Sequence, residues 1–202
     1  MQVAVILSGC GVFDGSEIHE TTLTLLHCAK NNLAVSCFAP DNDFQPIDHR
    51  TQQPMSSSRN ILGEAARLAR GKIQPLNELR VDDYQGLLFP GGFGAATQLS
   101  DFAQTTQDWT VDPAIKQLIL TAQAKHIAMG FLCIAPVLAA GVLPHLTLTL
   151  GQESDMTKRL QQKGHTLITC EATDFITDQT HRILSTPAYL ATEDLTQIDH
   201  GI

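Results

Sequence analysis

The chain has 202 residues, 43% hydrophobic and 17% charged, a composition typical of a globular protein rather than a disordered one. Its 13 basic and 21 acidic residues give a formal net charge of -8. That balance argues against nucleic acid as the main partner, because a phosphate-binding face needs clustered Lys and Arg. No apolar run approaches the roughly 20 residues of a membrane-spanning helix, so we expect no membrane partner either.

The cysteines and the N-terminus both favour a reducing compartment. The five cysteines form no CxxC pair, and the odd count leaves at least one of them without a disulfide partner. The first residues enter a strand pattern directly, without the charged region and cleavage site of a signal peptide. We therefore expect a cytoplasmic protein with free thiols. We expect no metal site, because no Cys or His residues stand in close ligand spacing.

The first part of the chain predicts the start of a parallel α/β sheet. Residues 3–7 form a short apolar run, typical of a strand that is buried on both faces. A turn and cap at residues 14–16 precede an expected helix over 16–29, and residues 33–39 form a second strand. Strand, helix and strand in this order make a βαβ unit.

A polar excursion from the sheet follows over residues 40–60. Ser58 is expected to cap a helix that runs to about residue 68. The segment that holds Arg59, Arg67, Arg70 and Lys72 is the most basic part of the chain. A solvated helix face explains it best, and contact with an anionic ligand is the alternative.

The remaining pattern continues the alternation, without a repeat or a linker, so we expect one domain over residues 1–202. Loop or short helix is predicted for residues 97–110. The expected strands are 84–89, 146–150, 166–170, 175–177 and 182–185, and the expected helices are 113–122, 156–164 and 188–198.

The stretch IAMGFLCIAPVLA, residues 127–139, organises the site. It begins as a buried strand, turns at Gly130, and resumes in a helical pattern that tolerates Pro136 in its first turn. Cys133 lies at the bend, as in a nucleophile elbow. The positive end of the following helix would favour its thiolate. The alternative is a buried structural cysteine in an ordinary strand-to-helix turn.

A glycine pair ends the preceding predicted strand. Gly91 and Gly92 follow Pro90, and glycines allow a backbone to approach a neighbouring group closely and direct its N–H donors there.

Three motifs occur in order: SGCGVFDGSEIHE (8–20), FPGGFGAATQLSDF (89–102) and GFLCIAP (130–136). Together they resemble the ElbB branch of the DJ-one/PfpI superfamily, known as isoprenoid-biosynthesis glyoxalases, within the glutamine-amidotransferase-like group. The resemblance covers essentially the whole chain. It implies a flavodoxin-like three-layer α/β sandwich with a mostly parallel central sheet, a nucleophile elbow, and a homodimer.

The resemblance also implies which residues form the site. Cys133 is the reactive group, and a Glu from the first helix lies against it. Counting back from the end of that helix favours Glu20, whereas counting forward from the first strand favours Glu17. The amides of Gly91 and Gly92 lie beside the sulfur.

The resemblance implies a cofactor-independent glyoxalase of the lyase class, with a small α-oxoaldehyde as substrate, and the chemistry of this residue set can be written for it. Cys133 would attack the aldehyde, and the Glu would move a proton between the two adjacent carbons. The amides of Gly91, Gly92, Cys133 or Ile134 would stabilise the oxyanion.

The alternative is a redox-responsive protein whose Cys133 is oxidised, with Cys10 lining the pocket or acting as a resolving thiol. Only 5% of the residues are aromatic, which leaves little surface for stacking a flavin, so we expect no cofactor. Position 134 is Ile where related hydrolases carry His, so a hydrolytic triad is not expected. His19 and His145 are the remaining histidine candidates for catalysis.

Overall fold

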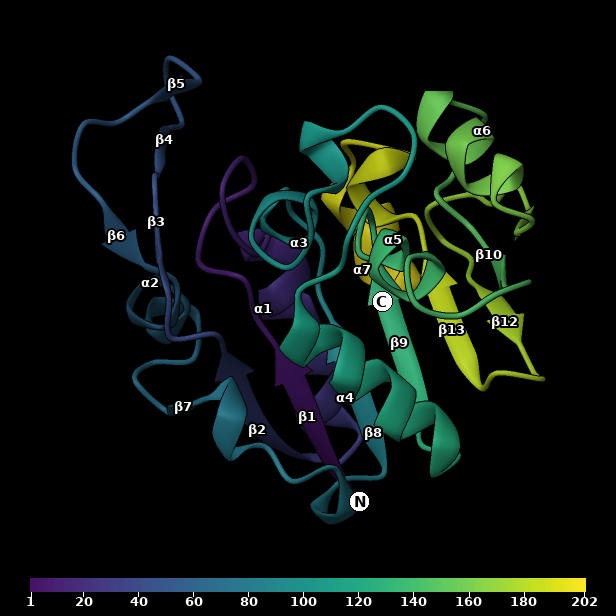
Figure 1. The fold of residues 1–202 in the computed structure, drawn as a ribbon. Helices are drawn as coiled ribbons and strands as arrows, with labels where there is room; N and C mark the ends of the chain where they lie inside the picture. Colours follow the sequence, from purple (N-terminus) through teal and green to yellow (C-terminus); the bar gives the residue numbers. More distant parts are fainter.

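The computed structural model describes all residues from 1 to 202 and centres on a seven-stranded sheet (Figure 1). Its strands are β1 (Gln2–Ile6), β2 (Ala34–Ala39), β7 (Ile73–Pro75), β8 (Gly86–Phe89), β9 (Ala128–Leu132), β12 (Ile176–Asp178) and β13 (Ile183–Thr186). Across the sheet the order is β12-β13-β9-β8-β1-β2-β7, and only the β12–β13 pair is antiparallel. The predicted flavodoxin-like fold with a mostly parallel sheet is confirmed.

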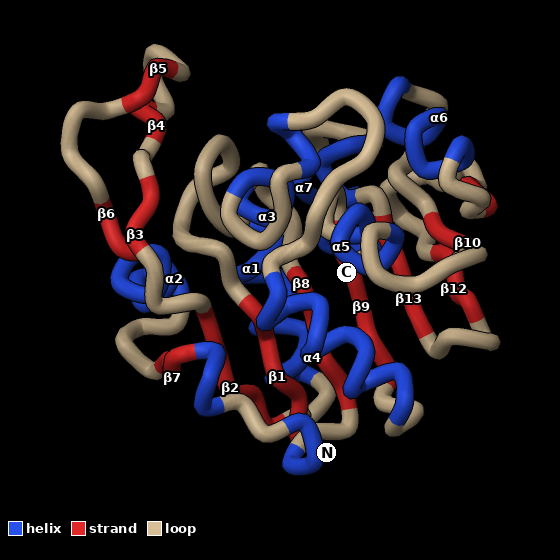
Figure 2. Tube along the Cα trace, in the orientation of Figure 1, coloured by secondary structure: helices blue, strands red, loops and turns tan.

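Helices lie on both sides of the sheet, which gives three layers (Figure 2). They are α1 (Ile18–Lys30), α2 (Ile61–Leu68), α3 (Gly94–Thr97), α4 (Pro113–Ala124), α5 (Pro136–Ala140), α6 (Asp155–Gln162) and α7 (Leu195–Gly201). In Figure 1, α4 crosses in front of the strands and α1 lies behind them.

The central strand β1 shows why the sheet needs a layer on each face. Ala4 and Ile6 belong to the apolar cluster that includes α4 and α5, whereas Val5 and Leu7 belong to the cluster that includes α2. Successive side chains of a strand point to opposite faces, so a run without polar residues is buried on both.

Two predicted helix caps are wrong by one to two residues, and in both cases the expected serine is used elsewhere. Glu17, not Ser16, caps α1, because the Ser16 hydroxyl accepts a hydrogen bond from the Ser8 N–H at 2.9 Å. Asn60, not Ser58, caps α2, because the Ser58 hydroxyl donates to the Phe44 carbonyl at 3.2 Å.

The polar excursion is an arm, residues 40–60, that stands away from the sheet in Figure 1. It contains β3 (Asp43–Phe44) paired with β6 (Arg59–Asn60), and β4 (Ile47–Asp48) paired with β5 (Gln53–Pro54). The Asp14 carboxylate accepts a hydrogen bond from the Ile47 N–H at 2.7 Å and so fastens the arm to the loop after β1.

The C-terminal part differs most from the prediction. The strands expected at 146–150 and 166–170 shorten to β10 (Thr147–Leu148) and β11 (Thr166–Leu167), which form a separate small sheet. The helix expected at 188–198 is split into the 3-10 turn Ala188–Leu190 and α7, because Asp194 caps a new helix by accepting from the Thr196 N–H. None of the helices has the length and apolar character needed to cross a bilayer.

Candidate active site

Four connections meet at the carboxyl edge of the sheet, where β1, β8, β9 and β13 end side by side. The chain leaves β1 toward β2 on one side, whereas β8 leads to β9 on the other, so β1 and β8 flank a topological switch point. Open α/β sheets bind ligands at such a point, outside the carboxyl ends of the strands. The predicted site residues lie on these connections and on α1.

The predicted elbow is present directly after β9, but the turn predicted at Gly130 is wrong, because Gly130 lies within the strand and the chain bends at Cys133. Cys133 has a φ of 56°, in the left-handed region that non-glycine residues rarely adopt. Its N–H donates to the Thr186 carbonyl at 2.9 Å, and the Ala135 N–H donates back to Leu132 at 2.9 Å. These bonds hold the strained bend in place. The side chain is largely buried, with 6% of the residue's surface exposed.

Glu20 lies against Cys133 and is 0% exposed. The Gly91 N–H donates to its Oε2 at 2.9 Å, and the Tyr189 N–H donates to its Oε1 at 3.4 Å. The Cys133 side chain lies close enough to the same carboxylate that each group shifts the pKa of the other. Burial, followed by the charge of Glu17, raises the pKa of Glu20 to about 7. The carboxyl group therefore titrates at the pH at which a general acid–base is most effective.

The sulfur is not activated in the way the sequence suggests. Burial, followed by the charge of Glu20, raises the pKa of Cys133 well above its usual range. The amides of Gly92 and Ile134 act in the opposite sense but do not outweigh burial. Helix α5 begins only at Pro136, three positions after the sulfur, so its positive end is not adjacent. The raised pKa therefore favours a thiol beside Glu20 at neutral pH, in place of the predicted thiolate.

Glu17 has a different place from Glu20. Its Oε2 accepts a hydrogen bond from the Glu20 N–H at 2.7 Å as the cap of α1, and its own N–H donates to the Gly91 carbonyl at 2.8 Å. It therefore orients the start of α1 against the glycine loop and contributes a charge near Glu20. Of the two carboxylates that the sequence left open, Glu20 contacts the sulfur.

The glycine pair lies in tight contact with both catalytic candidates. A Cβ on Gly91 would overlap the Cβ of Cys133 and lie 2.5 Å from Oε2 of Glu20. Gly92 has a φ of 94°, and a Cβ there would meet the backbone of residues 15–17. The Gly91 N–H binds Glu20 and the Cys133 N–H binds Thr186, so two of the four predicted oxyanion donors are occupied. The amides of Gly92 and Ile134 remain directed at the sulfur.

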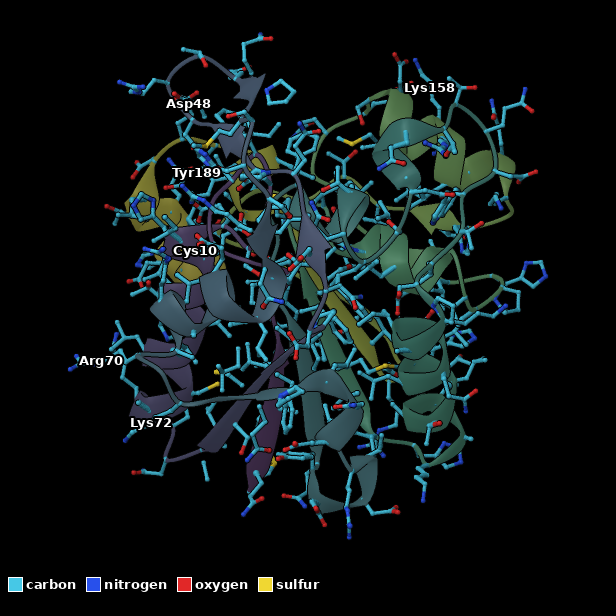
Figure 3. The ribbon with its side chains drawn as sticks, turned by 60° about the vertical axis from the view of Figure 1, so that its left-hand side comes forward. Cys10, Asp48, Arg70, Lys72, Lys158 and Tyr189 are labelled. Atoms are coloured by element: carbon cyan, nitrogen blue, oxygen red, sulfur yellow. The ribbon has the colours of Figure 1, made fainter.

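Cys10 is half-buried in the loop between β1 and α1 and forms no disulfide. Burial, followed by the charge of Glu64, raises the pKa of its thiol, and Arg67 lowers it. Glu64 itself accepts from Arg59 at 3.3 Å and from Arg67 at 3.2 Å. These arginines are therefore ion-paired. Figure 3 shows Arg70 and Lys72 at a distance from Cys10, toward the lower part of the molecule.

Tyr189 was missed by the sequence analysis. It follows the last parallel strand, β13, within the 3-10 turn that the pattern had merged into a helix. Its hydroxyl lies 2.6 Å from Nδ1 of His19. A usable signal was present, since an aromatic residue three positions after a strand that ends at the site edge is well placed to reach the site.

His145, the other histidine candidate, is exposed and lies 3.4 Å from the Gly164 carbonyl, away from Cys133 and Glu20.

A groove of about 350 Å³ opens on another part of the sheet, between α1 and the end of α7. It is lined mainly by apolar residues of the central strands, and neither Cys133 nor Glu20 belongs to it. The chemistry of the thiol and the carboxylate, rather than the size of a cavity, therefore locates the candidate site.

Two curated relatives match the full length of the chain. The rat ES1 protein homolog, mitochondrial, is 37% identical over 216 residues, which cover 100% of this chain and 80% of the relative. The human glutamine amidotransferase-like class 1 domain-containing protein 3, mitochondrial, is 37% identical over 212 residues, covering 100% and 79%. The chain belongs to this ES1 family of glutamine amidotransferase-like class 1 domain proteins.

Two solved structures resemble this chain. An isoprenoid biosynthesis protein with an amidotransferase-like domain from Ehrlichia chaffeensis superimposes with a TM-score of 0.92 at 31% identity, covering 100% of this chain and 93% of the other. Drosophila melanogaster DJ-1beta, at 14% identity and a TM-score of 0.56 over 92% and 80% of the chains, shows a shared fold. No family model matches the sequence.

Proposed function

We propose that this ES1 family protein is a cofactor-independent glyoxalase that converts glyoxal to glycolate and methylglyoxal to lactate. The observation that carries the proposal is the close approach of Cys133 to a fully buried Glu20 whose pKa is raised to about 7, since a Cβ on Gly91 would overlap the Cβ of Cys133 and lie 2.5 Å from Oε2 of Glu20. A nucleophile and a proton carrier within contact of each other are the two groups that this reaction requires.

The first step forms the carbon–sulfur bond. Glu20 accepts the thiol proton as the sulfur of Cys133 attacks the aldehyde carbon. It then returns this proton to the aldehyde oxygen, which gives a hemithioacetal and leaves Glu20 as a carboxylate for the next step. The free amides of Gly92 and Ile134, which are directed at the sulfur, would face the oxygen that develops negative charge.

The second step is an internal redox exchange between two carbons. Glu20 removes the proton from the former aldehyde carbon, and a proton is delivered to the neighbouring ketone carbon through an enediol. The first carbon is oxidised to a thioester and the second is reduced to an alcohol, so no external oxidant is needed. Water then cleaves the thioester, releasing the 2-hydroxy acid and restoring the thiol.

The site gives less support to amide hydrolysis. Besides burial, the groups that shift the pKa of Cys133 most are Glu20 and the amides of Gly92 and Ile134, and none of them is a histidine. A Ser or Cys hydrolase depends on a histidine base beside its nucleophile. The redox-responsive alternative is also less favoured, because oxidation of a thiol does not require a buried proton carrier such as Glu20 beside it.

The test is lactate formation from methylglyoxal by the purified protein after treatment with a chelator. We expect activity in the parent, and its loss by at least about 100-fold in Cys133→Ser and Glu20→Gln. Cys170→Ala is the matched control, because Cys170 is also 6% exposed but has no contact with Glu20. Full activity in Cys133→Ser would refute the proposal. An inactive parent whose Cys133 reacts rapidly with peroxide would favour the redox role.

We also propose that the protein acts as a homodimer in the cytoplasm and that residues 1–202 form one domain. The rat and human relatives are named as mitochondrial proteins, so the compartment is best tested by fractionation of the source cells.

A further inference from the structure

One side-chain pair at the edge of the site is not used by the proposed mechanism. His19 extends from the first turn of α1 with 56% of its side chain exposed, and its Nδ1 lies 2.6 Å from the hydroxyl of Tyr189. The Oε1 of Glu17 lies 3.9 Å from the same nitrogen. This hydrogen bond links α1 to the turn after β13, across 170 residues of sequence.

Tyr189 reaches the site in two ways. Its hydroxyl binds His19, and its backbone N–H donates to Oε1 of the buried Glu20 at 3.4 Å. The residue before it, Ala188, has a φ of 44° and is 0% exposed. Such strain persists only where surrounding contacts hold the chain in place. The phenol–imidazole bond is one of those contacts.

We infer that His19 and Tyr189 are positioning residues for Glu20. Their side-chain bond holds the turn after β13 close to α1, so that the Tyr189 N–H stays on Oε1 while the Gly91 N–H holds Oε2. Without the bond, the turn relaxes and the carboxylate retains one of its two amide donors. The effect on turnover rests on the proposed glyoxalase, but the effect on Glu20 and Cys133 does not.

The direction of the effect follows from the groups that face Glu20. These are Glu17 from α1, the Cys133 thiol after β9, the Tyr189 amide after β13 and the Gly91 amide after β8. An amide that donates to a carboxylate stabilises its charged form, so losing the Tyr189 amide makes Glu20 harder to ionise. The pH at which Cys133 changes its reactivity should then move upward.

The test is alkylation of Cys133 by iodoacetamide between pH 5.5 and 9, with the modified peptide identified by mass spectrometry. The variants are Tyr189→Phe, His19→Leu, their double variant, and His19→Gln, whose amide can still bind the hydroxyl. His27→Leu is the matched control, since His27 also ties α1 to another element, through Asp199 at 2.8 Å, but not at the site. Thermal unfolding of each variant confirms that it is folded.

We expect the inflection of the Cys133 profile to move upward by about half a pH unit in Tyr189→Phe and in His19→Leu. The double variant should match either single one, His19→Gln should recover most of the parent profile, and His27→Leu should leave it unchanged. An unchanged profile in folded Tyr189→Phe or His19→Leu overturns the inference, as do additive shifts in the double variant. If Tyr189→Phe does not fold, the exposed His19 variants decide by the same criterion.

Glyoxalase measurements on the same proteins separate this inference from the proposed function. Where the parent makes lactate, kcat should fall about fivefold in Tyr189→Phe, with KM within about twofold. A parent without activity, together with the shifted profiles, would refute the glyoxalase and leave the positioning role standing.

Discussion

Replacing Glu20 with Gln should remove a loss of stability that grows as the pH rises through 7, while it abolishes the proposed chemistry. The carboxyl group is 0% exposed, and its pKa is raised from 4.5 to about 7, chiefly by burial. Gln has nearly the same shape and can still accept from the Gly91 N–H, whereas its NH2 group faces the Tyr189 N–H at a cost that does not depend on pH. It cannot carry a charge, so it avoids the cost of burying one.

The sign and size of the effect follow from proton linkage. Between about pH 4.5 and 7, the folded state keeps a proton on Glu20 that the unfolded state has released. The free energy of unfolding therefore falls by about 1.4 kcal/mol per pH unit through this range, to a total of about 3 kcal/mol. Stability from this group is fully present below pH 4.5 and is lost as the pH rises through 7.

The measurement is urea unfolding from pH 4.5 to 8, followed by the fluorescence of Trp109, the single tryptophan. The difference in unfolding free energy between Glu20→Gln and the parent should rise by about 1–3 kcal/mol in favour of the variant across this range. Thr21→Ala is the control. It loses a buried hydroxyl that donates to the Glu17 carbonyl, and its difference should not change with pH. A constant difference for Glu20→Gln would refute the raised pKa.

Three further predictions concern the surroundings of the site. Gly91→Ala should destabilise by about 1–3 kcal/mol through overpacking and suppress activity, whereas Gly63→Ala, on an exposed turn of α2, should stabilise by about 0.5–1 kcal/mol. Arg159→Lys should lower stability by about 1–3 kcal/mol in urea unfolding, because the guanidinium donates to three carbonyls of the 102–107 loop. Burial lowers the pKa of His165. The stability that its neutral imidazole contributes should therefore be present above about pH 6.5 and be lost as the pH falls, and the difference in unfolding free energy between the parent and His165→Asn measures it.

The sheet and the elbow could be predicted from the sequence because both depend on patterns within short segments. Runs such as residues 3–7 are buried on both faces, and the bend at Cys133 lies between a strand and a helix that starts with Pro136. Strand order and burial then place the ends of β8 and β9 side by side. Before any coordinates were known, only the family resemblance placed Cys133 beside the glycine loop, because the strand order is a finding of the structure.

The details of the site could not be read in the same way, because they depend on contacts between distant segments. Glu17 and Glu20 are three positions apart on one helix, and only the approach of Gly91 decides which of them meets the sulfur. Whether Cys133 is a thiol or a thiolate depends on its burial by several elements. Burial raises the pKa of Cys133, whereas the helix end was expected to lower it. Tyr189 was hidden because an apolar run concealed the break before α7.

The buried positions with a strained backbone lie beside Glu20. Eight non-glycine residues have positive φ, and six of them lie in exposed positions. The two buried ones are Cys133 and Ala188, which stand at the ends of adjacent strands and direct the thiol and the Tyr189 amide toward the same carboxylate. A buried charge, a strained nucleophile and a strained turn each oppose stability. Their convergence on one side chain is what a site built for proton transfer would show, and a purely structural cysteine would need none of them.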